Sequence, residues 1–289
     1  MHFVQVKGIL SNSNGMNLYR GCTHGCIYCD SRSRCYGFTH AFEDIEVKIN
    51  APELLEHSLK HKGKRCMIGT GSMSDPYMPL EKELRLTRKC LELIDKYNYG
   101  FTVITKSDLI LRDLDLLKSI NKKTKCVVQM TITTFDDGLC RILEPNVCVT
   151  SKRIEALKIL HDNNIPTIVW MTPILPFIND NEANIMNILK ACKEAGVYGI
   201  MTFGIGLTLR EGDREYYYDK LDKYFPGLKY KYIKRYGNSY ELPVPDEYRL
   251  NNLLINYCKE NNMEYRSDKL FEYLNTFEDK IHGEEISLF

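Results

Sequence analysis

The chain has 289 residues and a mass of 33.6 kDa, which suits one large domain or one domain with a modest appendage. Its apolar fraction of 44% excludes intrinsic disorder, and its formal net charge of +1 excludes a globally basic, nucleic-acid-coating protein. The eleven cysteines cannot all pair, and a chain of this length folds without disulfides. We therefore expect reduced thiols, some of them metal ligands, in a soluble cytoplasmic protein without a signal peptide or a membrane span.

Short apolar runs rich in β-branched residues predict six strands along the chain. They lie at 16–19, 66–69, 101–105, 126–134, 166–174 and 198–205. Between them, apolar residues recur at the spacing of one helix face, as they do from Leu80 to Ile94. Alternating strands and helices predict an α/β fold with a parallel sheet and its helices outside. Six units are too few for a complete eight-fold barrel, and periodicity alone leaves a doubly wound sheet as the rival.

The pattern changes after about residue 210. Residues 214–240 are rich in Tyr and Lys, the prolines at 243 and 245 break any helix, and residues 250–258 predict a final amphipathic helix. We expect a core over residues 1–210 and a C-terminal extension over residues 211–289 that packs on it.

The most specific motif is a triplet of cysteines, Cys22, Cys26 and Cys29, directly after the first predicted strand. Gly21 and Gly25 let the backbone turn tightly, so that three sulfurs converge on one point. Thiolates are soft ligands that suit iron–sulfur clusters or zinc. Structural zinc requires four ligands, whereas three cysteines fit a four-iron cluster with one iron left open. The competing interpretations are a zinc site and three buried apolar cysteines.

The C-x3-C-x2-C spacing, with Tyr28 before the last cysteine, resembles the cluster motif of radical S-adenosylmethionine (SAM) enzymes. The chain is most similar to their spore photoproduct lyase-like branch, also described as DNA repair photolyase-like. The similarity covers residues 15–205, most of the chain. The residues that carry it are Asn17-Leu18-Tyr19-Arg20-Gly21-Cys22, Ser74-Asp75-Pro76-Tyr77, Thr105-Lys106-Ser107, Arg112-Asp113, Glu144-Pro145 and 173–180.

The resemblance implies a partial (β/α)6 TIM-like barrel of the radical SAM type, matching the six predicted units. It implies a [4Fe-4S] cluster held by Cys22, Cys26 and Cys29, with SAM chelated by the open iron. An electron from the reduced cluster would cleave SAM to methionine and a 5′-deoxyadenosyl radical, which abstracts hydrogen from a substrate. A reductant such as a flavodoxin or a ferredoxin is implied as a partner.

The resemblance also implies which residues contact SAM. The segment from Ser72 through Ser74 to Asp75 would bind its amino group, and Lys106, which ends the third predicted strand, would reach its carboxylate. Thr131 on the fourth predicted strand is the preferred ribose contact, and Tyr28 joins the cofactor-binding set. Each position also has an ordinary interpretation: a turn with a capping residue, a solvated lysine or a β-branched residue that fills a strand.

The sequence departs from the lyase pattern at two positions. Spore photoproduct lyases use a cysteine to return hydrogen to the product radical, and the matching position here is Ser72, whose O–H bond is too strong for that role. A tyrosine after the last cluster cysteine is replaced by Asp30. The resemblance therefore supports the branch and not repair of spore photoproduct itself. Cys35 is left as a replacement donor, a ligand to another centre or a spectator.

A basic, aromatic segment between Lys223 and Tyr240 suggests a place to look for a substrate. It carries five basic and six aromatic residues and no acidic ones. Basic charge attracts phosphates and rings stack on bases, which is compatible with a nucleic acid. The alternation from Lys229 to Tyr232 favours a plainer interpretation, an edge strand with rings inward and lysines outward.

Three hypotheses follow. The leading one is a radical SAM enzyme, lyase-like, with DNA or another nucleic acid as the first substrate class to test. The second keeps the chemistry and changes the target to a protein, a peptide or a small molecule. The third is a non-catalytic, metal- or cluster-containing protein that binds nucleic acid. The sequence does not identify the substrate, the hydrogen-atom donor or the oligomeric state.

Overall fold

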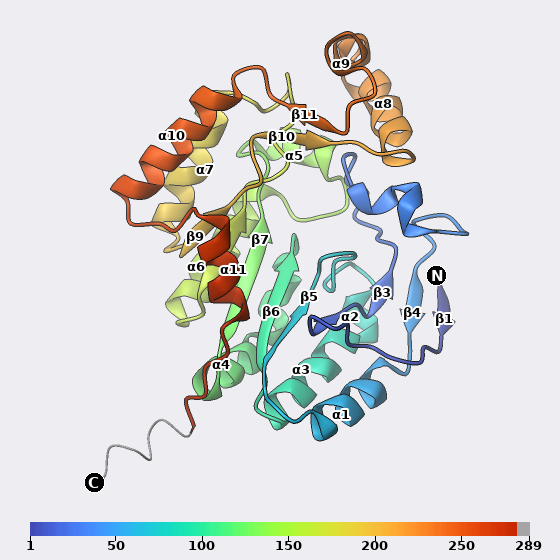
Figure 1. Ribbon diagram of the computed structural model, residues 1–289, viewed down its shortest axis with the longest axis vertical. Coiled ribbons are helices and arrows are strands. Elements are labelled where there is room, and N and C mark those ends of the chain that lie inside the picture. The colour runs from blue at the N-terminus through green and yellow to red at the C-terminus, as the bar shows by residue number, and fades with distance from the viewer. Residues whose placement is uncertain (282–289) are drawn as a thin grey trace.

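A computed structural model describes residues 1–281. Its centre is a parallel sheet of six strands, and each predicted strand corresponds to one of them (Figure 1). The strands are adjacent in sequence order, with no reversal, so the doubly wound alternative is wrong. The edge strands do not pair with each other among residues 1–281, which leaves an open sheet. In spatial order the strands are β2 (Gly15–Met16), β5 (Met67–Thr70), β6 (Gly100–Thr105), β7 (Cys126–Thr131), β8 (Thr167–Trp170) and β9 (Gly199–Met201).

Helices connect successive strands of the sheet. They are α1 (Ala51–His61), α2 (Glu81–Leu84), α3 (Leu86–Lys96), η3 (Asp108–Asp113), α4 (Leu114–Lys123), α5 (Asp137–Leu143), α6 (Thr150–Asp162) and α7 (Glu182–Glu194). All of them except α5 contribute to the main apolar core on one face of the sheet, whereas Leu143 of α5 belongs to a second apolar cluster. The single helix expected from Leu80 to Ile94 is two helices, because Arg85 adopts a left-handed conformation between them. None of the helices described in residues 1–281 is long and apolar enough to cross a membrane.

The predicted first strand divides between two sheets. Only β2 joins the large sheet, and the next residues form β3 (Tyr19–Arg20), which pairs antiparallel with β4 (Glu46–Lys48). β1 (His2–Val4) lies parallel to the other edge of β4. This small sheet sends the chain from Arg20 into the cysteine loop, which continues through η1 (Asp30–Arg32) and η2 (Arg34–Tyr36).

The C-terminal region returns to the core in three places. β10 (Gly206–Thr208) pairs with β11 (Glu241–Pro243), α10 (Glu247–Glu260) packs on α7, and α11 (Ser267–Asn275) packs on β9. Leu270 and Leu274 of α11 form a cluster with Val127, Ile168 and Met201, so this helix covers the sheet face opposite the main core. The last predicted helix is therefore not the final one. The division at residue 210 stays a prediction, and residues 282–289 of the expected extension lie outside the described residues.

The edge strand expected at residues 229–232 is wrong. α8 (Asp213–Tyr224) and α9 (Leu228–Tyr236) form a pair of packed helices at the end of the molecule that carries β10 and β11 (Figure 1). Tyr232 and Tyr236, four residues apart, lie on the same face of α9 and are buried against Tyr217 and Tyr218 of α8. The segment is a helix and not a strand, because a helix places Tyr232 and Tyr236 on one face and buries both rings against α8.

Candidate functional site

The cysteine loop makes a sharp turn directly after β3. Gly21 has a φ of +88°, and a Cβ atom there would lie 2.4 Å from the carbonyl oxygen of Phe42. The same carbonyl accepts a hydrogen bond from the backbone N–H of Cys22 at 3.2 Å. The close approach of the loop at residue 42 thus requires glycine before the first cysteine.

A segment that follows α5 holds the rest of the loop. The N–H of Ile27 donates to the carbonyl of Leu143 at 2.9 Å, and the N–H of Asn146 donates to the carbonyl of His24 at 3.1 Å. The Asn146 side-chain amide also donates to the carbonyl of Thr23 at 2.8 Å. These bonds satisfy the backbone of an irregular loop and thereby define where its cysteines point.

The three cysteines line a small cavity of about 90 Å³, together with residues that the sequence singles out for SAM. Among the described residues, the three sulfurs do not all lie within 4.8 Å of one another. A single tetrahedral zinc ion with Zn–S bonds of about 2.3 Å would need its sulfurs about 3.8 Å apart. The arrangement of the three sulfurs therefore does not match a single tetrahedral zinc ion. The cavity residues common to the prediction are Cys22, Cys26, Cys29, Ser72, Ser74, Asp75, Lys106 and Thr131.

Burial keeps the thiols of Cys22 and Cys26 protonated. It raises the pKa of Cys22 to about 12, with the charge of Asp75 adding to the effect, and it raises the pKa of Cys26 well above its usual range. Metal ligation requires thiolates, so loading this site releases protons and needs the positive charge of iron to stabilise the anions. The donors and their environment therefore fit an iron–sulfur cluster.

Asp75 ties the second predicted cofactor segment to the end of β6. Its carboxylate accepts hydrogen bonds from the Thr105 hydroxyl at 2.8 Å, from the Lys106 N–H at 2.7 Å and from the Tyr77 N–H at 2.8 Å. Nδ1 of His24 in the cysteine loop lies 3.5 Å from the same carboxylate. With its oxygens committed to these partners, Asp75 positions the cavity wall and has little capacity left for a ligand.

A buried ion pair supports the cysteine loop from the other side. Glu144 and Arg153 pair with no exposure to solvent, and the hydroxyl of Tyr28 donates to Glu144. Arg153 also donates to the carbonyl of Thr131 at 3.0 Å. Burial alone would raise the pKa of Glu144, but Arg153 and then Lys106 lower it, so the carboxylate stays ionised. The pair thus links the loop to the end of β7.

Lys106 is the cation that remains available in the cavity. Among residues 1–281, its ammonium group has no hydrogen-bond or ion-pair partner, and it lies 6.0 Å from the centre of the Tyr28 ring. Burial would lower the pKa of this ammonium group, but negative charge nearby, that of Cys26 when it is ionised and that of Glu144, raises it, so the group is charged at neutral pH. A free charged lysine beside the cysteines suits the carboxylate of an amino-acid ligand.

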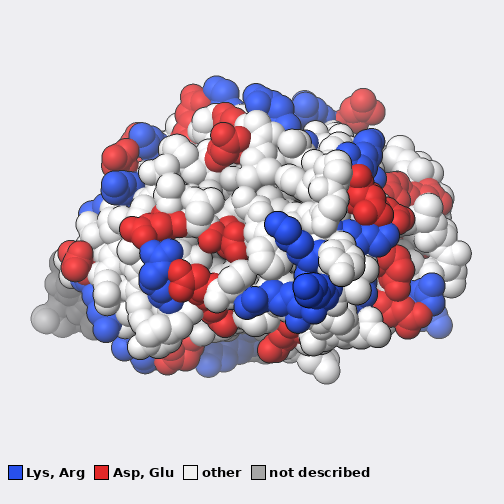
Figure 2. All heavy atoms as spheres, turned by 90° about the horizontal axis from the view of Figure 1, so that it is seen from above, with Lys and Arg blue, Asp and Glu red and all other residues white. Residues whose placement is uncertain are grey.

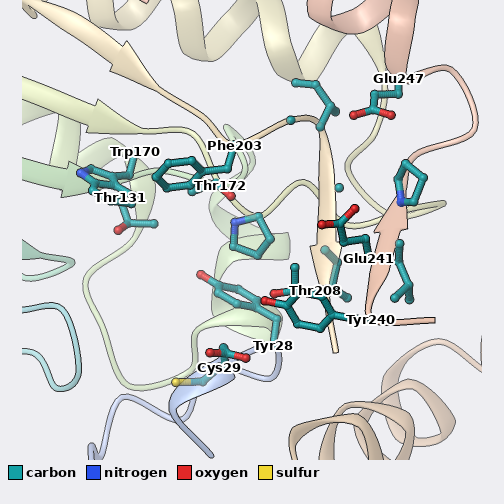
Figure 3. A pocket seen from close by; sticks show the side chains of 18 of the residues that line it. Tyr28, Cys29, Thr131, Trp170, Thr172, Phe203, Thr208, Tyr240, Glu241 and Glu247 are labelled. Carbon is teal, nitrogen blue, oxygen red and sulfur yellow. The ribbon is translucent and has the colours of Figure 1, made fainter. Parts of the chain in front are cut away.

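A second, larger cavity of about 640 Å³ adjoins the small one. Ser72, Lys106, Thr131 and Cys29 line both, so these side chains stand where the two meet. Figure 3 shows Tyr28 and Trp170 among the side chains that line the larger cavity. Residues of β10, β11 and the loop after β9 line this cavity, together with residues that follow β8 and begin α10. Figure 3 labels Thr172, Phe203, Thr208, Tyr240, Glu241 and Glu247 among them. Four residues, three of them from the predicted cofactor set, therefore stand between the two cavities.

The residues predicted to contact SAM differ in whether their polar groups already have hydrogen-bond partners within the protein. The Ser74 hydroxyl donates to the carbonyl of Tyr19 at 2.9 Å, and the Tyr28 hydroxyl is bound to Glu144. The side-chain polar groups of Ser72, Lys106 and Thr131 have no hydrogen-bond partner among the described residues. The ring of Tyr28 lines the larger cavity. All six residues stay predictions as cofactor contacts.

Two further sequence features lie away from the cavities. Cys35 is exposed, lines neither cavity, and its sulfur lies 3.3 Å from the guanidinium of Arg210. Arg112 and Asp113 pair with each other, and Arg112 also binds Glu81, in a structural network behind the cysteine loop.

Sequence reasoning missed three contributors to the site. His24 was visible inside the cysteine motif without an assigned role, and burial lowers its pKa, so its imidazole is neutral. Arg153 lies within an ordinary helix pattern and gives no local signal. Trp170, the only tryptophan, ends β8 at the edge of the cavity, which could have marked it.

Comparison with known proteins identifies the family. Residues 16–189, more than half of the chain, match the family model of the Radical SAM superfamily, so the chain belongs to that superfamily. Membership implies an enzyme that uses an iron–sulfur cluster and SAM. An uncharacterized protein of Methanocaldococcus jannaschii is 40% identical over 170 residues, which cover 58% of this chain and 62% of that protein. The match thus spans less than two thirds of that relative.

Solved structures show the same fold. A spore photoproduct lyase variant with bound SAM and dinucleoside spore photoproduct aligns with a TM-score of 0.62 and 15% identity, over 86% of this chain and 74% of its own. Streptococcus suis SuiB bound to its precursor peptide aligns with a TM-score of 0.52 and 13% identity, over 90% of this chain and 49% of its own. The expected likeness to the lyase is therefore confirmed at the level of the fold.

The buried pair gives a first prediction. Replacing Glu144 with Gln keeps the side-chain shape but leaves the Arg153 guanidinium buried without a counter-charge. We expect Glu144→Gln to lower the free energy of unfolding by about 3–5 kcal/mol and to reduce the iron retained after reconstitution. The measurements are denaturant unfolding and iron analysis.

The matched control is Glu155→Gln on α6, which breaks the exposed pair between Lys152 and Glu155. That change should cost about 0–1 kcal/mol and leave the iron content unchanged. Equal effects of the two substitutions would contradict the supporting role of Glu144.

Proposed function

We propose that this protein is a radical SAM enzyme whose [4Fe-4S] cluster is held by Cys22, Cys26 and Cys29. The single observation that carries the proposal is the cavity that these cysteines share with the unpaired ammonium group of Lys106. A cluster held by these three cysteines would supply the electron for reductive cleavage of SAM and so give access to the radical chemistry of this superfamily.

The residues of the chain bind and orient the cofactor. Lys106 neutralises the carboxylate of SAM, and Ser72 and Thr131 contact it where the small cavity meets the large one. The ring of Tyr28 would border the bound cofactor from the wall of the larger cavity, while its hydroxyl stays hydrogen-bonded to Glu144. Asp75 and Glu144 hold the two walls and act through the groups that they position. The larger cavity then receives the substrate.

This proposal predicts cluster-dependent cleavage of SAM. Anaerobic reconstitution with iron and sulfide should give about four iron atoms per chain, and reduction in the presence of SAM should release 5′-deoxyadenosine. Replacing Cys22, Cys26 and Cys29 together with Ala should abolish both, because no other ligand set replaces three converging thiolates.

Cys35→Ala is the matched control, since Cys35 follows the motif closely but lies outside both cavities. It should keep the full iron content and the full yield of 5′-deoxyadenosine. The assignment would be overturned by a triple variant that retains iron and turnover.

The identity of the substrate is a separate part of the proposal, and a nucleic acid is the first class to test. Lys231, Lys234 and Arg235 are exposed on α9, close in sequence to β11 at the cavity. The support is narrower than the sequence suggests, because Tyr232 and Tyr236 are buried and cannot stack on bases. Of the six aromatic residues in the segment, Tyr230 is the most exposed, at 69%.

Charge around the cavity favours a second candidate, a peptide with basic side chains. Asp30, Glu241 and Glu247 line the larger cavity, and Glu241 and Glu247 have no ion-pair partner among the described residues. Seen from the end that carries α8 and α9, acidic and basic side chains are interspersed, with one group of basic side chains near the centre (Figure 2). A phosphate backbone would therefore have to lie along α9 and away from the acidic cavity wall.

Binding distinguishes the two classes. We expect the protein to bind a single-stranded oligonucleotide in a salt-dependent way, and neutralising Lys229, Lys231 and Lys234 to weaken that binding by at least about tenfold at low salt. Fluorescence anisotropy against salt concentration measures both effects.

The control neutralises Lys118, Lys158 and Lys190, exposed lysines on the outer helices α4, α6 and α7, and should change binding little. Equal binding by both triple variants, or tighter binding of a lysine- and arginine-rich peptide than of the oligonucleotide, would remove the nucleic-acid proposal and leave the peptide class.

A further inference from the structure

A second group of metal-ligating side chains lies outside the cysteine site, on the small sheet of β1, β4 and β3. One ligand atom from each of His2, His40 and Glu46 lies within 4.8 Å of the other two. His2 of β1 is paired in register with Glu46 of β4, so the two side chains leave the sheet on the same face and side by side. His40 reaches them from the loop that precedes β4.

The two imidazoles are each oriented through Nδ1. Nδ1 of His2 lies 3.1 Å from a carboxylate oxygen of Asp44, and Nδ1 of His40 lies 2.9 Å from the carbonyl oxygen of Ala41. A histidine that donates Nδ1–H to a carboxylate or a carbonyl presents Nε2 as a metal ligand, and such partners accompany most metal-bound histidines. Nε2 of His40 already faces Glu46, at 2.8 Å from Oε1.

Packing restrains the group while leaving it open to solvent. The rings of His2 and His40 meet edge to face with centres 5.1 Å apart, and the ring of Phe38 packs on His40 at 5.7 Å. The His40 and Glu46 side chains are 20% and 17% exposed, whereas His2 is 43% exposed. His40 and Glu46 are therefore held, whereas His2, restrained by Asp44 and the edge of the His40 ring, lies on the solvent side of the group.

The charge balance permits a cation. Glu46 and Asp44 are acidic. Asp44 is paired with the N-terminal ammonium group at 3.0 Å, which leaves the charge of Glu46 for an ion, and Arg20 reaches Glu46 only at 3.5 Å. The guanidinium of Arg20 is held instead by the carbonyls of Tyr36 and Gly37, each at 2.9 Å. An ion bound between the histidines and Glu46 therefore needs no movement of Arg20.

We propose that His2, His40 and Glu46 bind a divalent transition-metal ion, with zinc as the reference ion, at a site separate from the cysteines. Two imidazoles and one carboxylate form a three-ligand set that zinc accepts, with water in the fourth position. Ligands about 2.1 Å from zinc stand about 3.4 Å apart in a tetrahedron, so a rotation of the exposed His2 ring completes the site.

The ion would connect β1 to the loop that supports the cysteine motif. The carbonyl of Phe42, two residues after His40, accepts the hydrogen bond from the N–H of Cys22. A metal that fixes His40 to β1 and β4 therefore restrains the segment against which the first cysteine is placed. The ion would thus have a structural role, and this role does not depend on whether the protein cleaves SAM.

Zinc binding to tag-free, anaerobically reconstituted protein tests the site, because the cysteine motif is then occupied by iron. We expect equilibrium dialysis with elemental analysis to find one zinc per chain in the wild type. His40→Ala and Glu46→Gln should each weaken binding by at least about tenfold. Zinc-edge X-ray absorption should show nitrogen and oxygen ligands and no sulfur.

His57→Gln is the control, because His57 and His61 form another exposed histidine pair, on α1, with ring centres 4.3 Å apart. It should bind zinc as the wild type does. Circular dichroism and iron content identify variants that remain folded, and the conservative Glu46→Gln keeps the test decisive if His40→Ala does not fold. Wild-type affinity in folded Glu46→Gln, or sulfur in the zinc coordination shell, would overturn the proposal.

Discussion

The cysteine loop is held from two sides by buried carboxylates, and the rest of the site depends on that clamp. Asp75 binds the end of β6 and lies beside His24 within the loop. The carboxylate of Glu144 accepts a hydrogen bond from the Tyr28 hydroxyl, and the guanidinium of Arg153 balances its negative charge. Ile27 and Tyr28 of the loop pack into an apolar cluster, but its backbone is irregular and makes no regular helix or strand hydrogen bonds. Fixed charges and backbone hydrogen bonds supply the order that converging metal ligands require.

The same clamp decides which polar groups remain for a cofactor. Asp75, Ser74 and the hydroxyl of Tyr28 already have hydrogen-bond partners within the protein. Lys106 and Thr131 instead line both cavities. The chain belongs to the radical SAM superfamily, in which the cofactors carry the reactive groups. Side chains that bind and orient the cofactors are therefore what the protein has to supply.

Much of this arrangement could be predicted from the sequence, because it rests on local signals. Six apolar runs gave the six parallel strands, and the cysteine spacing with Lys106 at the end of a strand placed the candidate site. The predicted strands at 126–134 and 166–174 were too long, since β7 and β8 end at Thr131 and Trp170 where the chain turns into the cavity wall.

What the sequence could not show depends on contacts between distant residues. Arg153 is an unremarkable helical residue until tertiary packing places it on Glu144. The alternation at residues 229–232 suggested a strand, but the burial of Tyr232 and Tyr236 against α8 makes it a helix. The covering of one sheet face by α11 likewise has no local signature, because the apolar side of that helix fits any apolar surface.

The most direct test of the central claim is a crystal structure of the anaerobically reconstituted protein with SAM. A four-iron cluster bound by the sulfurs of Cys22, Cys26 and Cys29 is the predicted result, with the SAM carboxylate within hydrogen-bonding distance of the Lys106 ammonium group. A single metal ion on the three cysteines, or SAM bound away from Lys106, would contradict the account.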